Sequence, residues 1–160
     1  MKKTLRFPLL PGILLLALLL TSCYDPIEKV RIDTPAYAYG DTMEQKLNVV
    51  LQGIYLPDDQ DFRGSLTIGR MTFDRIYFYP GGGLLSYAGK ERTFMGQIYF
   101  DYPTLQYSIE ITDPKLYELL TGEAGEKKSK LTISSPAASI EEAREINAEL
   151  KEKSPPLVKE

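Results

Sequence analysis

The chain has 160 residues, of which 43% are hydrophobic and 26% are charged, and its formal net charge is −3. This length and composition indicate one globular domain and exclude an intrinsically disordered chain. The chain has no histidine and a single cysteine. Serine, cysteine and zinc hydrolases of the usual kinds would therefore lack their base, nucleophile or ligands. We expect no catalytic residue, no metal site and no cofactor.

Residues 1–22 have the three-part pattern of a secretory signal peptide. Three basic residues lie among the first six, residues 9–20 are nearly all apolar, and the small polar pair Thr21-Ser22 follows. A transmembrane helix would need roughly 20 apolar residues without a break. Because Pro8 and Pro11 interrupt the apolar run, its clean part is too short to span a bilayer.

The segment Leu20-Thr21-Ser22-Cys23 resembles the lipobox of bacterial lipoproteins, which has a leucine, two small residues and a cysteine. In that family a dedicated signal peptidase cuts just before the cysteine, and diacylglycerol is attached to its thiol. The resemblance, which covers residues 1–23 only, implies cleavage between Ser22 and Cys23 and lipidation of Cys23. Two or more acyl chains hold a protein stably on a bilayer, whereas one chain does so only marginally.

Lipidation of Cys23 would place the mature protein outside the cytoplasm, anchored to the bacterial cell membrane. No thiol would then remain for catalysis or for a disulfide. Removing the leader leaves 16 Lys and Arg against 22 Asp and Glu, a formal net charge of −6. An acidic domain in this place is not expected to bind nucleic acid. Tyr24 is not the aspartate that retains lipoproteins in the inner membrane, and the choice between inner and outer membrane stays open.

Residues 23–42 are expected to form the lipidated N-terminus and a tether. They contain two prolines, mixed charges and no sustained period. As a flexible coil, residues 24–42 would span about 25 Å, and fully extended they would reach at most about 65 Å. A first edge strand over residues 29–32 is the alternative.

From residue 43 the chain consists of short alternating runs separated by turn residues, which is the pattern of β-strands. We expect a mainly β domain over residues 43–135, either a β-sandwich or an open antiparallel barrel of about seven strands. The predicted strands are 47–52, 64–68, 73–79, 84–87, 93–100, 106–111 and 130–133.

Two helices are predicted from their end signals. Asp113 is suited to cap a helix that begins at Pro114 and stops at Gly122. Ser139 and Glu142 fit a capping box, and this second helix should run to about residue 153. The region 136–160 is therefore expected to be a C-terminal helix and tail.

Tyrosine is abundant, with 11 residues, while tryptophan is absent. Alternation along 93–100 predicts that Phe94 faces the core and that Met95 and Tyr99 face outward. Tyr79 and Tyr102 lie at strand ends beside prolines, where side chains tend to be exposed. Tyrosines can bind ligands while keeping a hydroxyl in water, so Tyr79, Tyr99 and Tyr102 are the candidate ligand-binding residues. The alternative is that they serve only packing in strands.

Other motifs point less clearly to a site. Asp61, Asp74, Glu91 and Asp101 could include a general acid and base, although their spacing singles out no pair. A calcium loop starting at Asp59 is disfavoured because arginines occupy two ligand positions. The run Gly81-Gly82-Gly83 is read as a hairpin turn, and the basic run 127–130 as part of a loop.

The sequence therefore predicts a lipid-anchored extracytoplasmic protein with a non-catalytic binding or structural role in the cell envelope. One alternative is a module that binds cell-wall glycan or peptide through exposed tyrosines. The other is an envelope hydrolase that works with carboxylates alone. The membrane is the expected partner through Cys23, and an envelope protein or a cell-wall glycan is the candidate second partner.

Overall fold

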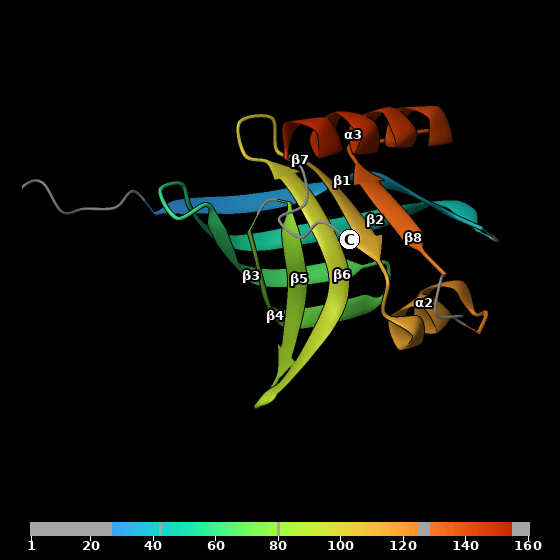
Figure 1. The fold of residues 1–160 in the computed structure, drawn as a ribbon, viewed down its shortest axis with the longest axis horizontal. Coiled ribbons are helices and arrows are strands. Elements are labelled where there is room, and N and C mark those ends of the chain that lie inside the picture. The colour runs from blue at the N-terminus through green and yellow to red at the C-terminus, as the bar shows by residue number, and fades with distance from the viewer. Residues whose placement is uncertain (1–26, 42, 80, 125–128, 155–160) are drawn as a thin grey trace, which may run out of the picture.

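The computed structural model describes residues 27–41, 43–79, 81–124 and 129–154. Its eight strands form a closed antiparallel barrel in which each strand pairs with the next and β8 pairs with β1 (Figure 1). The strands are β1 Glu28–Gly40, β2 Glu44–Leu56, β3 Asp61–Ile68, β4 Met71–Phe78, β5 Gly82–Ala88, β6 Glu91–Asp101, β7 Gln106–Ile111 and β8 Leu131–Ser135.

The mainly β prediction is confirmed, but the expected sandwich or open barrel of about seven strands is wrong. The eighth strand is β1, which occupies most of the predicted tether. Val30, Ile32, Ala36 and Ala38 alternate along it and are buried. Pro35 obscured this pattern. Its carbonyl accepts from the N–H of Ala137, on the β8 side of the strand, and pairing with β8 begins only at residue 37, so the missing N–H on that same side leaves the ladder with β2 intact. The segment is thus a strand and not a tether. Residues 29–32 belong to this first strand, as the alternative expected, and they pair with β2 alone.

Both predicted helices are confirmed. Helix α2, Pro114–Thr121, begins after Asp113, whose side chain accepts a hydrogen bond from the N–H of Leu116, and it ends at Gly122 in a left-handed conformation. Helix α3, Ile140–Lys153, begins after Ser139, whose hydroxyl accepts from the N–H of Glu142. In each case a local side chain satisfies a backbone N–H that has no partner within the helix.

The barrel interior is filled by side chains, as expected for eight strands. Its largest fully buried residues include Phe62, Phe78, Leu51, Leu66, Leu84, Ile98 and Tyr107. Figure 1 shows α2 at one end of the barrel and the start of β1 at the other, and Leu116 and Tyr117 of α2 pack into the core. At the β1 end, Tyr55, Phe100 and Tyr102 form a cluster of ring contacts.

A β-bulge corrects the predicted orientation of two residues in β6. Phe94 pairs with Leu85 and Gly96 pairs with Leu84, which leaves Met95 as an extra residue. The extra residue reverses the alternation. Phe94 is consequently 50% exposed and Met95 only 1% exposed, the opposite of the prediction.

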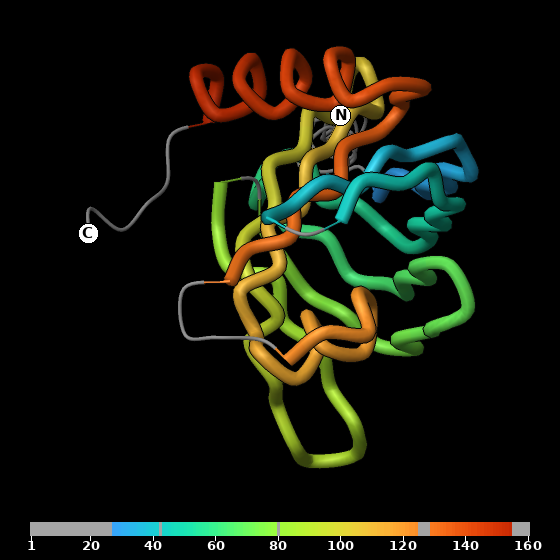
Figure 2. Tube along the Cα trace, turned by 90° about the vertical axis from the view of Figure 1, so that its right-hand side faces the viewer, coloured from blue at the N-terminus to red at the C-terminus, as the bar shows by residue number. Residues whose placement is uncertain are grey.

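Helix α3 lies across the outer surface of β6, β7, β8 and β1 and covers it (Figure 2). Ala143, Ile146 and Leu150 of the helix form a second buried cluster with Tyr99. Beside it, the buried Glu110 of β7 binds two lysines, Lys130 at 2.7 Å and Lys151 at 2.5 Å. Within the described residues, no helix has the length and apolar character needed to cross a membrane.

Candidate functional site

The predicted lipidation and cleavage residues, Cys23 and Ser22, lie outside the described part of the chain. Tyr99 does project from the outer side of β6, but α3 covers it, and it is 1% exposed. Its hydroxyl donates to Gln97 Oε1 at 3.0 Å, and the Lys151 ammonium lies 5.5 Å from its ring centre. The prediction that Tyr99 is a surface aromatic is therefore wrong, because a helix 40 residues further along the chain packs on it.

The other two candidate tyrosines differ in their surroundings. Tyr102 stacks on Tyr55 with ring centres 4.6 Å apart and serves the aromatic cluster at the barrel end. Tyr79 is 38% exposed and makes an edge contact with Tyr77. The three residues are not brought together, and only Tyr79 adjoins the groove described below.

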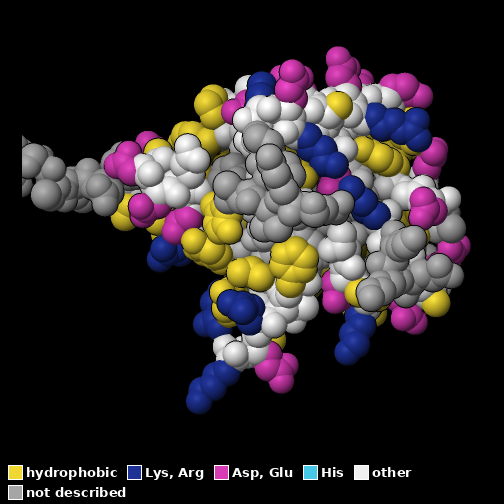
Figure 3. Space-filling view, viewed as in Figure 1, with side chains coloured by type: hydrophobic (Ala, Val, Ile, Leu, Met, Phe, Trp, Pro, Cys, Tyr) yellow, Lys and Arg dark blue, Asp and Glu magenta, His cyan; other side chains and the backbone are white. Residues whose placement is uncertain are grey.

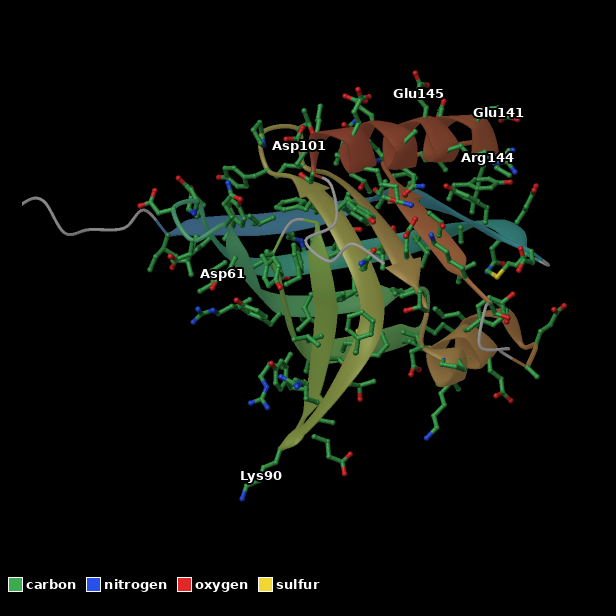
Figure 4. All side chains as sticks on the ribbon, viewed as in Figure 1. Asp61, Lys90, Asp101, Glu141, Arg144 and Glu145 are labelled. Atoms are coloured by element: carbon green, nitrogen blue, oxygen red, sulfur yellow. The ribbon has the colours of Figure 1, made fainter. Side chains whose placement is uncertain are left out.

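The candidate carboxylates do not converge either. Figure 4 shows Asp61 and Asp101 at separate positions at the β1 end of the barrel. Asp61 is buried and its Oδ2 accepts from Arg63 at 2.7 Å, while Asp101 accepts from Thr104 at 2.7 Å. No cluster of three or more acidic or cysteine residues able to hold a metal ion occurs among the described residues.

The two remaining motifs are accounted for by the fold. Gly81 has a positive φ of 71° and makes the turn into β5, as predicted, while Gly82 and Gly83 belong to the strand itself. Of the basic run 127–130, residues 127 and 128 lie outside the described residues, and Lys130 pairs with Glu110.

A groove of about 1000 Å³ runs over the outer surface of β1 to β5. It is formed where outward-facing positions of adjacent strands lie side by side in the register of the sheet. We call it the arginine groove. It is lined by Lys29, Arg31, Gln52, Ile54, Arg63, Ser65, Asp74, Arg75, Tyr77 and Tyr87, together with Gly53, Gly64 and the core residues Val30 and Ile76.

Arg63 is held in place from two sides. Its guanidinium donates to Asp61 Oδ2 at 2.7 Å and lies 5.8 Å from the ring centre of Tyr77. The hydrogen bond to Asp61 and the charge of that carboxylate raise the pKa of Arg63. Because a guanidinium has five N–H donors, Arg63 keeps donors for a ligand, and its side chain is 59% exposed.

Arg75 repeats this arrangement on the next strand. Its Nη2 donates to the carbonyl of Gly89 at 2.6 Å, and the guanidinium lies 5.3 Å from the ring centre of Tyr87. A guanidinium fixed over an aromatic ring loses less side-chain freedom when it binds an anion. Arg63 and Arg75 are thus two positioned cationic groups on β3 and β4.

Arg31 of β1 lies on the far side of the groove. It donates to the Gln52 amide oxygen and, at 3.3 Å, to Asp33 Oδ2. Lys29 lies two residues earlier on the same face of the strand. The groove therefore has cationic groups on both sides.

Two glycines form the bare backbone floor of the groove. Gly53 and Gly64 are register partners on β2 and β3. A Cβ on Gly53 would lie 2.2 Å from the carbonyl oxygen of Arg63, and one on Gly64 would lie 2.1 Å from that of Gln52. Since such contacts are not tolerated, both positions need glycine for close approach of the strands.

Charge is distributed unevenly over the domain. The lining of the arginine groove has four Lys or Arg and one Asp, whereas the whole sequence has 19 Lys and Arg against 22 Asp and Glu. Helix α3, which packs on β6, β7, β8 and β1, carries five Glu against three Lys or Arg. Figure 3 shows acidic side chains along the upper edge over α3, with Lys and Arg side chains near them, and further Lys and Arg side chains at the lower left, where Figure 4 labels Lys90.

Sequence reasoning missed the groove because its basic residues are far apart in the chain. Arg31, Arg63 and Arg75 each occupy an outward position in an alternating run. That regularity was the available signal, but strand pairing was needed to bring the three together. No protein-family model matches this chain, and neither a curated protein nor a solved structure matches it.

Proposed function

We propose that this chain is the precursor of a bacterial envelope lipoprotein, anchored by lipid on Cys23, whose barrel binds a negatively charged ligand in the arginine groove. The binding is non-catalytic. The anchor is supported by the charged and apolar leader that ends in Leu20-Thr21-Ser22-Cys23.

The observation that carries the binding function is the arrangement of three arginines around one groove. Each arginine is oriented by a hydrogen bond to a neighbouring residue, and each guanidinium keeps further N–H donors for a ligand. Guanidinium groups form paired hydrogen bonds with carboxylates and phosphates, so the ligand carries one of these groups. Gln52 and the two groove tyrosines supply neutral polar contacts around it.

A cell-wall glycan would supply such a ligand only through charged groups. The sequence predicts glycan binding through a surface of exposed tyrosines. Tyr99 is buried under α3 and Tyr102 stacks on Tyr55, which leaves Tyr79 beside the groove. The groove arginines therefore replace the tyrosines as the proposed binding groups.

The anchor is tested by following maturation in cells supplied with labelled fatty acid. Wild type should lose residues 1–22 and take up label, while Cys23→Ala should remain an uncut, unlabelled precursor. Ser22→Ala keeps a small residue before the cysteine and should mature like wild type. Normal maturation of Cys23→Ala would refute the anchor.

A further inference from the structure

The distance between the proposed anchor and the barrel is short. Because β1 begins at Glu28, only residues 24–27 separate it from Cys23. At the reach of a fully extended chain, the Cα atoms of Cys23 and Glu28 are at most about 18 Å apart. A lipidated Cys23 lies at the bilayer surface, so the β1 end of the barrel is held against that surface.

The arginine groove starts at this same end. Lys29 and Arg31, the first basic residues of β1, line it, and Lys29 is within about 22 Å of Cys23 along an extended chain. Arg63 also lies near this end, since β3 begins at Asp61 and Asp61 binds it. The near part of the groove is therefore within reach of the headgroup layer.

The charge distribution sets which face turns toward an anionic bilayer. The groove carries an excess of positive charge and α3 carries an excess of negative charge. Figure 4 shows Glu141 and Glu145 on α3, which lies on the opposite side of the barrel from β3 and β4. An anionic surface attracts the groove and repels α3 over a Debye length of about 8 to 10 Å.

We infer that the arginine groove binds the phosphates of anionic lipid headgroups in the membrane that carries the anchor. This inference rests on the proposed function and names its ligand. The short link supplies a high local concentration of headgroups, and Arg63 and Arg75 supply fixed donors for phosphate oxygens. Binding would lay the β2–β4 face of the barrel on the bilayer.

The test uses the mature lipidated protein in vesicles. Lipid occupies Cys23, so Ser65→Cys introduces one reactive thiol in the groove, and Glu145→Cys places a matched one on the exposed face of α3. Each thiol receives a fluorophore, and the vesicles contain a lipid with a nitroxide quencher on its headgroup. Fluorescence quenching then measures contact of each face with the headgroups.

In vesicles that contain phosphatidylglycerol, the inference predicts stronger quenching at residue 65 than at residue 145. Quenching at residue 65 should be weaker in vesicles of phosphatidylcholine alone than in those with phosphatidylglycerol. Arg63→Gln and Arg75→Gln should each lower, about fivefold, the ratio of molecules whose groove contacts the headgroups to molecules whose groove does not. Circular dichroism of each variant verifies that the barrel is folded.

Equal quenching at the two positions, or equal quenching at 65 in the two kinds of vesicle, would overturn the inference. Equal quenching at 65 in the two kinds of vesicle, together with calorimetric binding of inorganic phosphate, would assign the groove to free phosphate instead. The mass of the purified protein shows beforehand whether Cys23 carries lipid, so failure of the anchor is distinguished from failure of the groove.

Discussion

Gly53 and Gly64 face one another across β2 and β3, and a Cβ on either would lie 2.7 Å from the Cα of the other. Because neither glycine has a side chain, the strands approach closely here and the groove lies directly over their backbone. Figure 1 shows β2 and β3 side by side along the barrel wall. A side chain here would push on backbone, which cannot rotate away as a flexible side chain can.

Gly64→Ala is accordingly expected to lower the free energy of unfolding by at least about 2 kcal/mol. Gly69→Asn is the matched control, since a Cβ at Gly69 meets nothing within 4 Å and asparagine tolerates the left-handed conformation. Urea unfolding followed by circular dichroism measures both. An equal, small loss in the two variants would show that the strands can separate without cost.

Replacing lysines beside Glu110 should cost more than replacing Glu110 itself. The Glu110 side chain is 5% exposed, whereas those of Lys130 and Lys151 are about 40% exposed. Without Glu110, both ammonium groups can turn to water, so Glu110→Gln should cost about 1 kcal/mol. The double variant Lys130→Met/Lys151→Met strands a buried carboxylate and should cost about 3 kcal/mol. The reverse order in urea unfolding would contradict this account of the cluster.

Stability should decline at alkaline pH. Burial lowers the pKa of Lys151, but the hydrogen bond to Glu110 and its charge outweigh burial, and the pKa is raised overall. Burial also raises the pKa of the Tyr99 and Tyr107 phenols. In all three cases the folded state holds the proton more tightly than the unfolded state, so the contribution is complete below about pH 10 and is lost as pH rises further.

These three groups should therefore change the free energy of unfolding little between pH 7 and 9. Above about pH 10 their titration should lower it. Tyr107→Phe removes one of the ionisable groups and should make the fall shallower. Denaturant unfolding across this pH range provides the measurement. A Tyr107→Phe curve parallel to that of wild type would exclude the phenol as a cause.

Tyr99 should contribute to stability through packing. Tyr99→Ala would leave a cavity between β6 and α3 and should cost about 3 kcal/mol, while Tyr99→Phe loses only the hydrogen bond to Gln97, about 1 kcal/mol. Tyr79→Ala is the exposed control and should cost less than Tyr99→Ala. Thermal unfolding of the three variants gives the ranking, and a small loss for Tyr99→Ala would place α3 away from β6.

The elements that sequence reasoning predicted well are those fixed by neighbours in the chain. Asp113 and Ser139 cap their helices through hydrogen bonds to residues three positions ahead. The elements it missed depend on distant residues. Closure of the barrel requires β1 to pair with β8, almost 100 residues later, and alternation alone cannot show which strands meet.

One β-bulge and packing between distant parts of the chain account for the errors at the candidate site. The bulge at Met95 exchanged the inward and outward positions around Phe94. Burial of Tyr99 followed from the docking of α3, which no feature near residue 99 indicates. The groove likewise joins Arg31, Arg63 and Arg75 only after β1 to β5 have formed a continuous wall.

The central claim, that the arginine groove binds anions, is tested most directly by calorimetric titration of the mature protein in detergent micelles with pyrophosphate. Wild type should bind pyrophosphate, and Arg63→Gln/Arg75→Gln should bind it at least tenfold more weakly, because each arginine supplies a charged hydrogen bond. The control Arg70→Gln/Lys115→Gln removes the same charge from exposed residues outside the groove and should bind like wild type. Equal affinities for the two double variants, or no binding by wild type, would contradict the claim.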